Sequence, residues 1–341
     1  MKALILAAGK GTRLLPLTDN IPKPLIPLCN LPTLLFVVDK IFKSGIQDIG
    51  LVISPVHKEY FYEFMKQYSL MDSIELIFQN EPLGVAHAVK EAKGYINQED
   101  FLLYLGDNLI QDDLGPYRKE FQQGSTDALL LLKEIEDPSK FGVAQLGPNG
   151  KLIGIEEKPI KPKSNLAVTG LYFFKNKIFN EIEKIKFSER GELEITDAIS
   201  SLMTKKNIVG RKLYGWWVDT GSREQILEAN SFIMDQIFSG KFTNLYENYE
   251  FTDRILLGEN SNIENVKTEG HAIIGHNSNI YSTRLSNGVT IGDKNIIKDS
   301  SVFNSIILDG NNYNNCEIIN SIIDSGIQEG VNNRIIDIIE T

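Results

Sequence analysis

The chain has 341 residues, of which 42% are hydrophobic and 23% are charged. This length suits two domains, and the composition excludes a disordered or collagen-like chain. Lys and Arg together number 35 against 45 for Asp and Glu, which gives a net charge of −10. Because proteins that bind nucleic acid carry a basic surface, we expect no nucleic-acid partner. An anionic substrate would therefore have to meet local cations or a metal ion.

Cysteine content and hydropathy bear on the compartment. Cys29 and Cys316 are too few for a disulfide scaffold and predict a reducing compartment. The apolar run at residues 1–8 leads directly into a glycine-rich segment, which favours a buried strand over a secretory signal. No apolar stretch approaches the roughly 18 to 20 residues that span a bilayer. We therefore expect a cytoplasmic protein without a membrane partner.

The first half of the chain alternates short apolar runs with helical patterns, which is typical of βαβ units on a parallel sheet. Strands are predicted at residues 3–7, 49–53, 74–78 and 101–105, and helices at 32–45, 57–68 and 85–93. Ligands of such sheets bind at the carboxyl ends of the strands. We expect one crevice lined by the loops after Ala7, Phe78 and Leu105.

The pattern changes twice further along the chain. Residues 127–174 are richer in strands, and a helix at 223–238 follows. Beyond Gly240 helical spacing disappears, and Asn, Ile, Ser and Gly dominate. We therefore predict two domains, at residues 1–240 and 241–341.

The second predicted domain contains an internal repeat. Residues 302–310 recur sixteen positions later as residues 318–326, and apolar residues six apart set a hexapeptide rhythm in Ile291, Ile297 and Phe303. One such unit cannot bury its own apolar side chains, whereas stacked coils form a continuous core. The repeat predicts a β-helix, with Asn and Gly at its corners.

A glycine-rich loop, Gly9-Lys10-Gly11-Thr12-Arg13, follows the first predicted strand. Its backbone N–H groups can meet phosphate oxygens. It matches neither the dinucleotide fingerprint, because Leu14 stands where a third glycine belongs, nor a P-loop. Arg13 and Lys23 add two cations suited to a triphosphate. Taken alone, the loop could also be a basic surface turn.

The run from Leu4 to Thr18, with Lys23, resembles the signature of sugar-1-phosphate nucleotidylyltransferases. Five further segments follow in the order of that family's motifs, at residues 79–84, 105–108, 156–159, 190–197 and 216–221. With the repeat-containing tail, the chain is most similar to the long type of glucose-1-phosphate thymidylyltransferase. The resemblance implies a Rossmann-like α/β domain with a mostly parallel sheet, followed by a left-handed parallel β-helix.

The resemblance also implies roles for individual residues. The nucleotide would be bound by Ala8, Gly9, Gly11, Thr12, Arg13, Lys23, Gln79 and Gly84. The sugar phosphate would be bound by Gly142, Glu157, Lys158, Thr169, Arg190 and Glu192. The catalytic residues would be Arg13, Lys23, Asp107 and Lys158. Without the resemblance, the run at residues 156–158 would be interpreted as a solvated charged surface.

Two aspartates are candidate metal ligands. Asp107 follows a predicted strand at the carboxyl edge of the sheet, and Asp219 lies in a short apolar segment before a turn. Mg²⁺ is usually held by one or two carboxylates together with substrate phosphates. An isolated Asp after a strand is more often a helix cap or turn residue, so the resemblance is what implies Mg²⁺ at Asp107 and Asp219.

The choice of base stays open in the sequence. The amide of Gln79 offers one donor and one acceptor, which fits thymine and uracil equally well. Pro24 and His87 both stand where relatives often carry Gln. We expect transfer of a nucleotidyl group from dTTP to glucose 1-phosphate, with UTP as the alternative nucleotide.

Two other functions are alternatives to nucleotidyl transfer. A non-catalytic regulatory subunit on the same fold would be expected to lose the metal or phosphate residues, which this chain keeps. Acetyl transfer by His271 or His276 in the tail is a weaker alternative, since the tail is short. We expect a homo-oligomer with contacts after Gly240 and no catalytic residue there. The apolar residues 334–339 would either dock on another subunit or fold back on their own coil.

Overall fold

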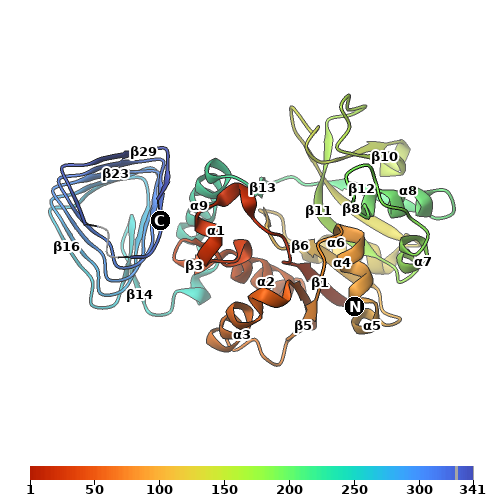
Figure 1. The fold of residues 1–341 in the computed structure, drawn as a ribbon, viewed down its shortest axis with the longest axis horizontal. Helices are drawn as coiled ribbons and strands as arrows, with labels where there is room; N and C mark the ends of the chain where they lie inside the picture. Colours follow the sequence, from red (N-terminus) through yellow and green to blue (C-terminus); the bar gives the residue numbers. More distant parts are fainter. Residues whose placement is uncertain (327–328, 341) are drawn as a thin grey trace. The chain divides into compact units, whose positions relative to one another are not determined.

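The computed structural model describes residues 1–326 and 329–340 (Figure 1). The chain divides into two compact units. The first comprises Met1–Gly9 and Val37–Asp219, and the second comprises Lys10–Phe36 and Thr220–Thr341. These units differ from the domains predicted from composition, whose boundary at residue 240 stays a prediction. Each unit is described by itself.

The first unit contains a mixed sheet in the order β10-β9-β11-β6-β1-β4-β5, with β8 paired to β11 and β12 paired to β8. Its parallel part consists of β1 (Lys2–Leu6), β4 (Ile49–Ile53), β5 (Ile74–Phe78) and β6 (Phe101–Leu105). These four strands confirm the predicted ones to within one residue. The chain runs from β1 outward through β4 and β5 and then returns to β6 on the other side of β1. A strand order that reverses in this way opens a ligand crevice at the carboxyl ends of the strands.

Antiparallel pairing extends the sheet beyond β6, and the predicted strand-rich region forms this part. Its strands are β8 (Ala128–Glu134), β9 (Gly142–Leu146), β10 (Leu152–Glu157), β11 (Leu166–Phe174) and β12 (Ile208–Lys212). All nine residues of β11 are buried. Two three-residue strands, β7 (Asn108–Ile110) and β13 (Trp217–Asp219), pair outside the main sheet.

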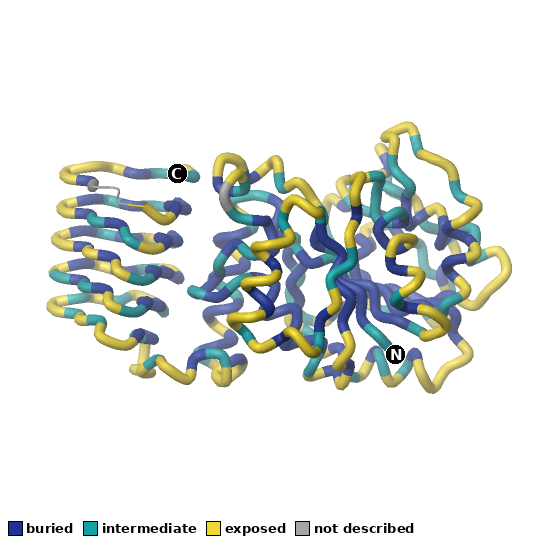
Figure 2. Tube along the Cα trace, turned by 60° about the horizontal axis from the view of Figure 1, so that its bottom comes forward, coloured by how far each residue is buried: buried dark blue, intermediate teal, exposed yellow. Residues whose placement is uncertain are grey.

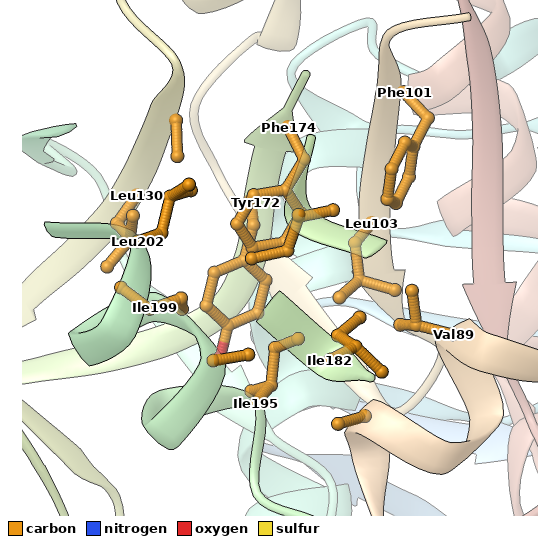
Figure 3. Packing of buried hydrophobic residues seen from close by; sticks show 14 of the residues in the cluster. Val89, Phe101, Leu103, Leu130, Tyr172, Phe174, Ile182, Ile195, Ile199 and Leu202 are labelled. Atoms are coloured by element: carbon orange, nitrogen blue, oxygen red, sulfur yellow. The ribbon is translucent and has the colours of Figure 1, made fainter. Parts of the chain in front are cut away.

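Helices connect these strands. They are α2 (Thr33–Lys43), α3 (Lys58–Gln67), α4 (Val85–Glu91), α5 (Lys93–Ile96), α6 (Leu114–Gln123), α7 (Ile178–Ile182) and α8 (Ile195–Met203). Figure 3 shows Val89 of α4, Ile182 of α7 and Ile199 of α8 packed against side chains of the sheet. None of the described helices combines the length and apolar character needed to cross a membrane.

The second unit contains the β-helix, whose strands form three parallel sheets. The first sheet holds β15 (Ile255–Gly258), β18 (Ala272–Ile274), β21 (Val289–Ile291), β24 (Ile306–Ile307), β27 (Ile322–Ile323) and β30 (Ile339–Glu340). The second holds β16 (Asn262–Glu264), β19 (Asn279–Tyr281), β22 (Ile296–Lys298), β25 (Asn312–Asn314) and β28 (Glu329–Val331). The third holds β17 (Lys267–Glu269), β20 (Arg284–Ser286), β23 (Ser301–Phe303), β26 (Glu317–Ile319) and β29 (Arg334–Ile336). One antiparallel strand, β14 (Tyr249–Phe251), pairs with β15.

The register of the coils confirms the sequence repeat. Val302 pairs with Ile318, and Ile306 pairs with Ile322, which is the predicted spacing of sixteen. Inward side chains such as Ile297 are fully buried, and Figure 2 shows buried and exposed residues alternating around each coil. Corner residues, many of them Asn, have left-handed backbone angles, as at Asn315 (φ 55°). Within residues 334–339, β29 and the first residue of β30 pair with the preceding coil, which supports the interpretation as a segment folded on its own coil.

The second unit also contains α9 (Arg223–Phe238) and the segment from Lys10 to Phe36. That segment holds η1 (Thr12–Leu14), α1 (Leu17–Asn20), η2 (Lys23–Leu25), β2 (Pro27–Leu28) and β3 (Leu31–Pro32). Helix α9 begins after Ser222, whose hydroxyl accepts a hydrogen bond from the backbone of Gln225, as an N-cap does. Cys29 and Cys316 are both buried, and neither forms a disulfide with the other.

Candidate active site

The loops after β1 and β6 start side by side in the first unit. The backbone N–H of Gly106 donates to the carbonyl of Leu6, with 2.9 Å between the two atoms. A Cβ atom on Gly106 would lie 3.0 Å from that carbonyl oxygen, so glycine permits the close approach. Both loops therefore begin at the same edge of the sheet. They carry Ala8 and Gly9, predicted to bind the nucleotide, and Asp107, a predicted metal ligand.

Asp107 and Asp219 are brought together by the pairing of β7 with β13. Asp219 lies opposite Asn108, the residue after Asp107. The amide of Asn108 donates to Asp107 Oδ1 over 2.9 Å, and its oxygen accepts from Trp217 Nε1 over 2.7 Å. Asn108 thus orients one aspartate and anchors the strand that ends in the other. Although the sequence motif includes Asn108, its positioning role was not predicted.

The two carboxylates suit Mg²⁺, whose remaining ligands are substrate phosphates, better than a metal ion held by protein side chains alone. Within residues 1–326 and 329–340, no group of three or more His, Cys, Asp or Glu side chains is arranged to hold a metal ion. A pair of carboxylates at a sheet edge matches the way Mg²⁺ is bound when substrate phosphates complete its shell. The residues therefore fit the metal that the sequence resemblance implies.

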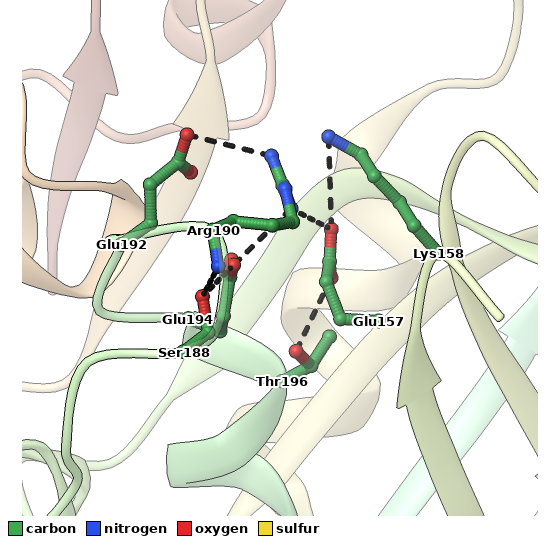
Figure 4. Close-up of polar contacts among 7 residues, drawn as sticks. All are labelled: Glu157, Lys158, Ser188, Arg190, Glu192, Glu194 and Thr196. Carbon is green, nitrogen blue, oxygen red and sulfur yellow. Dashed lines mark hydrogen bonds and ion pairs between the residues drawn. The ribbon is translucent and has the colours of Figure 1, made fainter.

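A second cluster contains both cations predicted to hold the sugar phosphate (Figure 4). The guanidinium of Arg190 lies 3.5 Å from Glu157, 3.4 Å from Glu192 and 3.1 Å from Glu194. The ammonium of Lys158 lies 3.9 Å from Glu157. Four predicted residues are therefore gathered in one place, with the guanidinium fixed by three carboxylates.

Supporting residues of this cluster were missed in the sequence. Thr196 donates to Glu157 over 3.2 Å, and Ser188 donates to Glu194 over 3.0 Å. Burial raises the pKa of Glu157, and the neighbouring Glu194 adds to this effect, while Lys158, Thr196 and Arg190 act in the opposite direction. Glu194 lies two residues from Glu192 in a predicted motif, but only the fold distinguishes their surroundings.

The backbone positions Lys158 and makes room for Glu157. Lys158 has φ 42°, in the left-handed region, and its N–H donates to the carbonyl of Phe141 over 3.0 Å. A Cβ atom at Gly142 would lie 3.1 Å from Thr196 and 3.4 Å from Glu157. Glycine at position 142 thus leaves space for the cluster. The ring of Phe141 also packs edge-on against Trp217, with 4.9 Å between centroids.

The predicted base-binding loop is joined directly to this region. Leu193 donates its backbone N–H to Leu83 over 2.8 Å and accepts one from Ala86 over 3.0 Å. Gly84 has φ 103°, and a Cβ atom there would lie 2.7 Å from the carbonyl oxygen of Leu193. The loop and the segment that carries Arg190 are therefore held at backbone contact.

Gln79 is buried at the start of the same loop. Its Nε2 lies 3.3 Å from the carbonyl of Gly84 and 3.0 Å from Nδ1 of His87. His87, which departs from many relatives, thus takes part in orienting the amide. Thr169 is placed differently: it is fully buried and donates to Leu131 over 2.9 Å. Its contact with the sugar phosphate stays a prediction.

The remaining predicted nucleotide residues belong to the second unit. Gly11 has φ 65°, and its carbonyl accepts a hydrogen bond from the hydroxyl of Thr18 over 3.0 Å. Lys23 is 9% exposed, whereas Thr12 and Arg13 are exposed. A Cβ atom at Gly221 would lie 2.6 Å from the Arg13 guanidinium, so glycine lets these two segments meet.

Comparisons with known proteins identify the family of the chain. The family model described as nucleotidyl transferase matches residues 2–236. The low-salt glycan biosynthesis nucleotidyltransferase Agl11 of Haloferax volcanii is 36% identical over 265 residues, which cover 76% of this chain and 74% of the relative. A glucose-1-phosphate thymidylyltransferase of Streptomyces antibioticus is 37% identical over 274 residues, covering 80% and 77% of the two chains.

A solved structure supports the same relationship. A UDP-glucose pyrophosphorylase in complex with UDP-glucose aligns with a TM-score of 0.63 and 25% identity over 69% of this chain and 98% of that chain. The predicted resemblance to nucleotidylyltransferases is confirmed by the family match and by these relatives. The chain belongs to the nucleotidyl transferase family.

Proposed function

We propose that the protein transfers a thymidylyl group from dTTP to glucose 1-phosphate, which gives dTDP-glucose and pyrophosphate. The observation that carries the proposal is the backbone contact between the Gln79 loop and the segment of Arg190, made through Leu193. This contact supports a base site beside the cluster, whose two cations and acceptors would bind the sugar phosphate. The similarity to a thymidylyltransferase supports the same reaction.

In this reaction a phosphate oxygen of glucose 1-phosphate forms a bond to the α-phosphorus of dTTP. The bond from that phosphorus to the bridging oxygen breaks, and pyrophosphate leaves with the electron pair. Since the nucleophile is already ionised, the protein needs no general base. Its task is to orient two anions that repel each other and to offset their charge.

Each group of residues has a task in the proposed reaction. Lys158 and Arg190 bind the phosphate of the sugar phosphate, and Glu157 and Glu192 accept hydrogen bonds from sugar hydroxyls. Arg13 and Lys23 bind the triphosphate, with backbone N–H groups of Ala8, Gly9, Gly11 and Thr12. Asp107 and Asp219 would hold Mg²⁺, which when bound would neutralise charge on the substrate phosphates. The presence of all these groups argues against a non-catalytic subunit.

UTP is the second candidate nucleotide, because the chain aligns with a UDP-glucose pyrophosphorylase. The Gln79 amide can pair with either base. Rates with dTTP and UTP, measured side by side at saturating glucose 1-phosphate, test the choice. A higher kcat/KM with dTTP supports the proposal, and a higher value with UTP replaces it with UDP-glucose synthesis.

Replacement of a single cationic residue should impair the binding of one substrate and not of the other. We expect Lys158→Ala to raise the KM for glucose 1-phosphate about tenfold or more, because a charge-assisted contact is lost, with little change in the KM for dTTP. Arg13→Ala should show the reverse pattern. Lys163→Ala is the control, since that ammonium is 68% exposed and lies 3.9 Å from Glu156. Equal effects on both KM values in both variants would contradict the division of tasks.

The protein is also proposed to be a homo-oligomer whose contacts include the region after Gly240. Apolar side chains such as Phe303 and Val331 are 37% and 58% exposed on the β-helix, and exposed apolar groups of this kind favour association. Light scattering on the full chain should give a multiple of the chain mass. The mass of a single chain would contradict the proposal.

A further inference from the structure

One buried amide in the second unit joins three segments of the chain. Asn230 lies in the middle of α9 and has no exposed surface. Its Oδ1 accepts hydrogen bonds from the backbone N–H of Cys29 over 2.8 Å and from the hydroxyl of Thr290 over 2.9 Å. Its Nδ2 donates to the carbonyl of Gly288 over 3.1 Å. Because a buried polar group is costly to leave unsatisfied, this arrangement ties the helix, the Cys29 segment and the β-helix together.

Two further hydrogen bonds strengthen the same junction. The side chain of Asn30 donates to the carbonyl of Ile291 in the β-helix over 2.8 Å. The hydroxyl of Tyr246, in the stretch before the first coil, donates to the carbonyl of Cys29 over 2.6 Å. Cys29 itself is fully buried, and burial raises the pKa of its thiol, so the thiol stays neutral. The contacts at this junction are therefore polar and directional.

The turn between β2 and β3 depends on these external contacts. Cys29 and Asn30 have φ values of 51° and 64°, and a two-residue hairpin turn with two positive φ angles favours Asn-Gly or Asp-Gly. Neither of those pairs occurs here, so local preference alone does not specify the turn. Hydrogen bonds between the turn and Asn230, Tyr246 and Ile291 supply what the local sequence lacks.

This hairpin follows the proposed triphosphate residue Lys23 closely. η2 (Lys23–Leu25) leads into Ile26, whose carbonyl accepts from both the backbone N–H and the hydroxyl of Thr33, over 3.1 and 2.8 Å. The hairpin thus lies within a short bridge from Ile26 to Thr33. Contacts that fix the hairpin therefore also restrict the adjoining segment that contains Lys23.

We propose that the β-helix positions the triphosphate-binding segment, with Asn230 and Thr290 as positioning residues. This inference rests on the proposed function, in which Arg13 and Lys23 bind the nucleotide triphosphate. It assigns the β-helix a task beyond assembly, although none of the proposed substrate-binding residues lies in the β-helix. Loss of the Thr290 hydroxyl should loosen the hairpin and weaken nucleotide binding while leaving the sugar-phosphate cluster unchanged.

The test is Thr290→Val, which keeps the shape of the side chain and removes the hydroxyl. We expect the KM for dTTP to rise about three- to tenfold, as for the loss of one buried hydrogen bond, with the KM for glucose 1-phosphate unchanged. Thr290→Ser retains the hydroxyl and should restore the KM for dTTP. Thr283→Val is the matched control, because Thr283 is also buried in the β-helix and donates over 2.7 Å only to Tyr281.

Hydrogen exchange of residues 22–32 in the full-length protein gives a readout that does not depend on activity. Faster exchange there in Thr290→Val, but not in Thr283→Val, together with the raised KM, supports the inference. Unchanged exchange, or equal effects in the two valine variants, overturns it. If the wild-type protein transfers no nucleotidyl group, the proposed function fails, and the exchange result still reports separately on whether the β-helix holds the hairpin.

Discussion

Asp107→Asn will lower kcat by about 10²-fold or more while the fold is retained, by analogy with the removal of other preorganised charge-stabilising groups. The amide keeps an oxygen that can accept the hydrogen bond from Asn108, which now spans 2.9 Å, so local geometry should survive. What is lost is the negative charge that would hold Mg²⁺. Asp219→Asn should behave in the same way, because β13 places it opposite Asn108.

Steady-state rates over a Mg²⁺ titration check this prediction. Asp113→Asn is the control, since Asp113 is an exposed residue that precedes α6 and makes no side-chain capping bond. Circular dichroism should show the same thermal transition for all three variants. Near-normal turnover of Asp107→Asn at ordinary Mg²⁺ concentrations would mean that the metal ligands lie elsewhere.

Arg190→Ala should have the second large effect. Three carboxylates, those of Glu157, Glu192 and Glu194, lie within 3.5 Å of this guanidinium. Its removal eliminates a proposed phosphate ligand and leaves Lys158 as the cation of the cluster, beside carboxylates that would face an anionic substrate. We expect kcat/KM for glucose 1-phosphate to fall about 10²-fold, since hydrogen bonds to charged groups are among the strongest.

Arg190→Lys should recover only part of this loss, because an ammonium cannot reproduce the planar fork of donors. Arg211→Ala is a matched control: the Arg211 side chain is 32% exposed, compared with 39% for Arg190, and its guanidinium lies 2.6 Å from Glu120. An equal loss in Arg190→Ala and Arg211→Ala would indicate a general effect on the fold. A full recovery in Arg190→Lys would show that only the charge matters.

Strands could be predicted wherever the pattern of their own residues is enough to identify them. The strands β1, β4, β5 and β6 are short, largely apolar runs bounded by turn residues, and their order along the chain predicts a parallel sheet. The β-helix was predictable because the sequence of each coil repeats that of its neighbour. Val302 and Ile318, for example, occupy equivalent positions in adjacent coils.

The missed features depend on distant partners. β7 and β13 are three residues each, too short for a periodicity, and only their pairing brings Asp219 beside Asn108. The roles of Ser188 and Thr196 arise from contacts with Glu194 and Glu157, which the sequence alone does not specify. The grouping of residues 10–36 with the β-helix was equally hidden, because Asn230 in the middle of a helix gives no sign of its three partners.

The separation in the sequence between residues that contact each other also bears on the order in which parts of the protein fold during synthesis. Each coil of the β-helix pairs with the next one, as Ile255 does with Ala272, so coils can add one after another as they emerge. The hairpin at Cys29 emerges early, yet its partners at Gly288 and Ile291 are translated much later. A ribosome must therefore pass residue 291 before the hairpin can acquire its final contacts. A chain that stops earlier would contain every strand of the mixed sheet but would leave the junction at Cys29 unfinished.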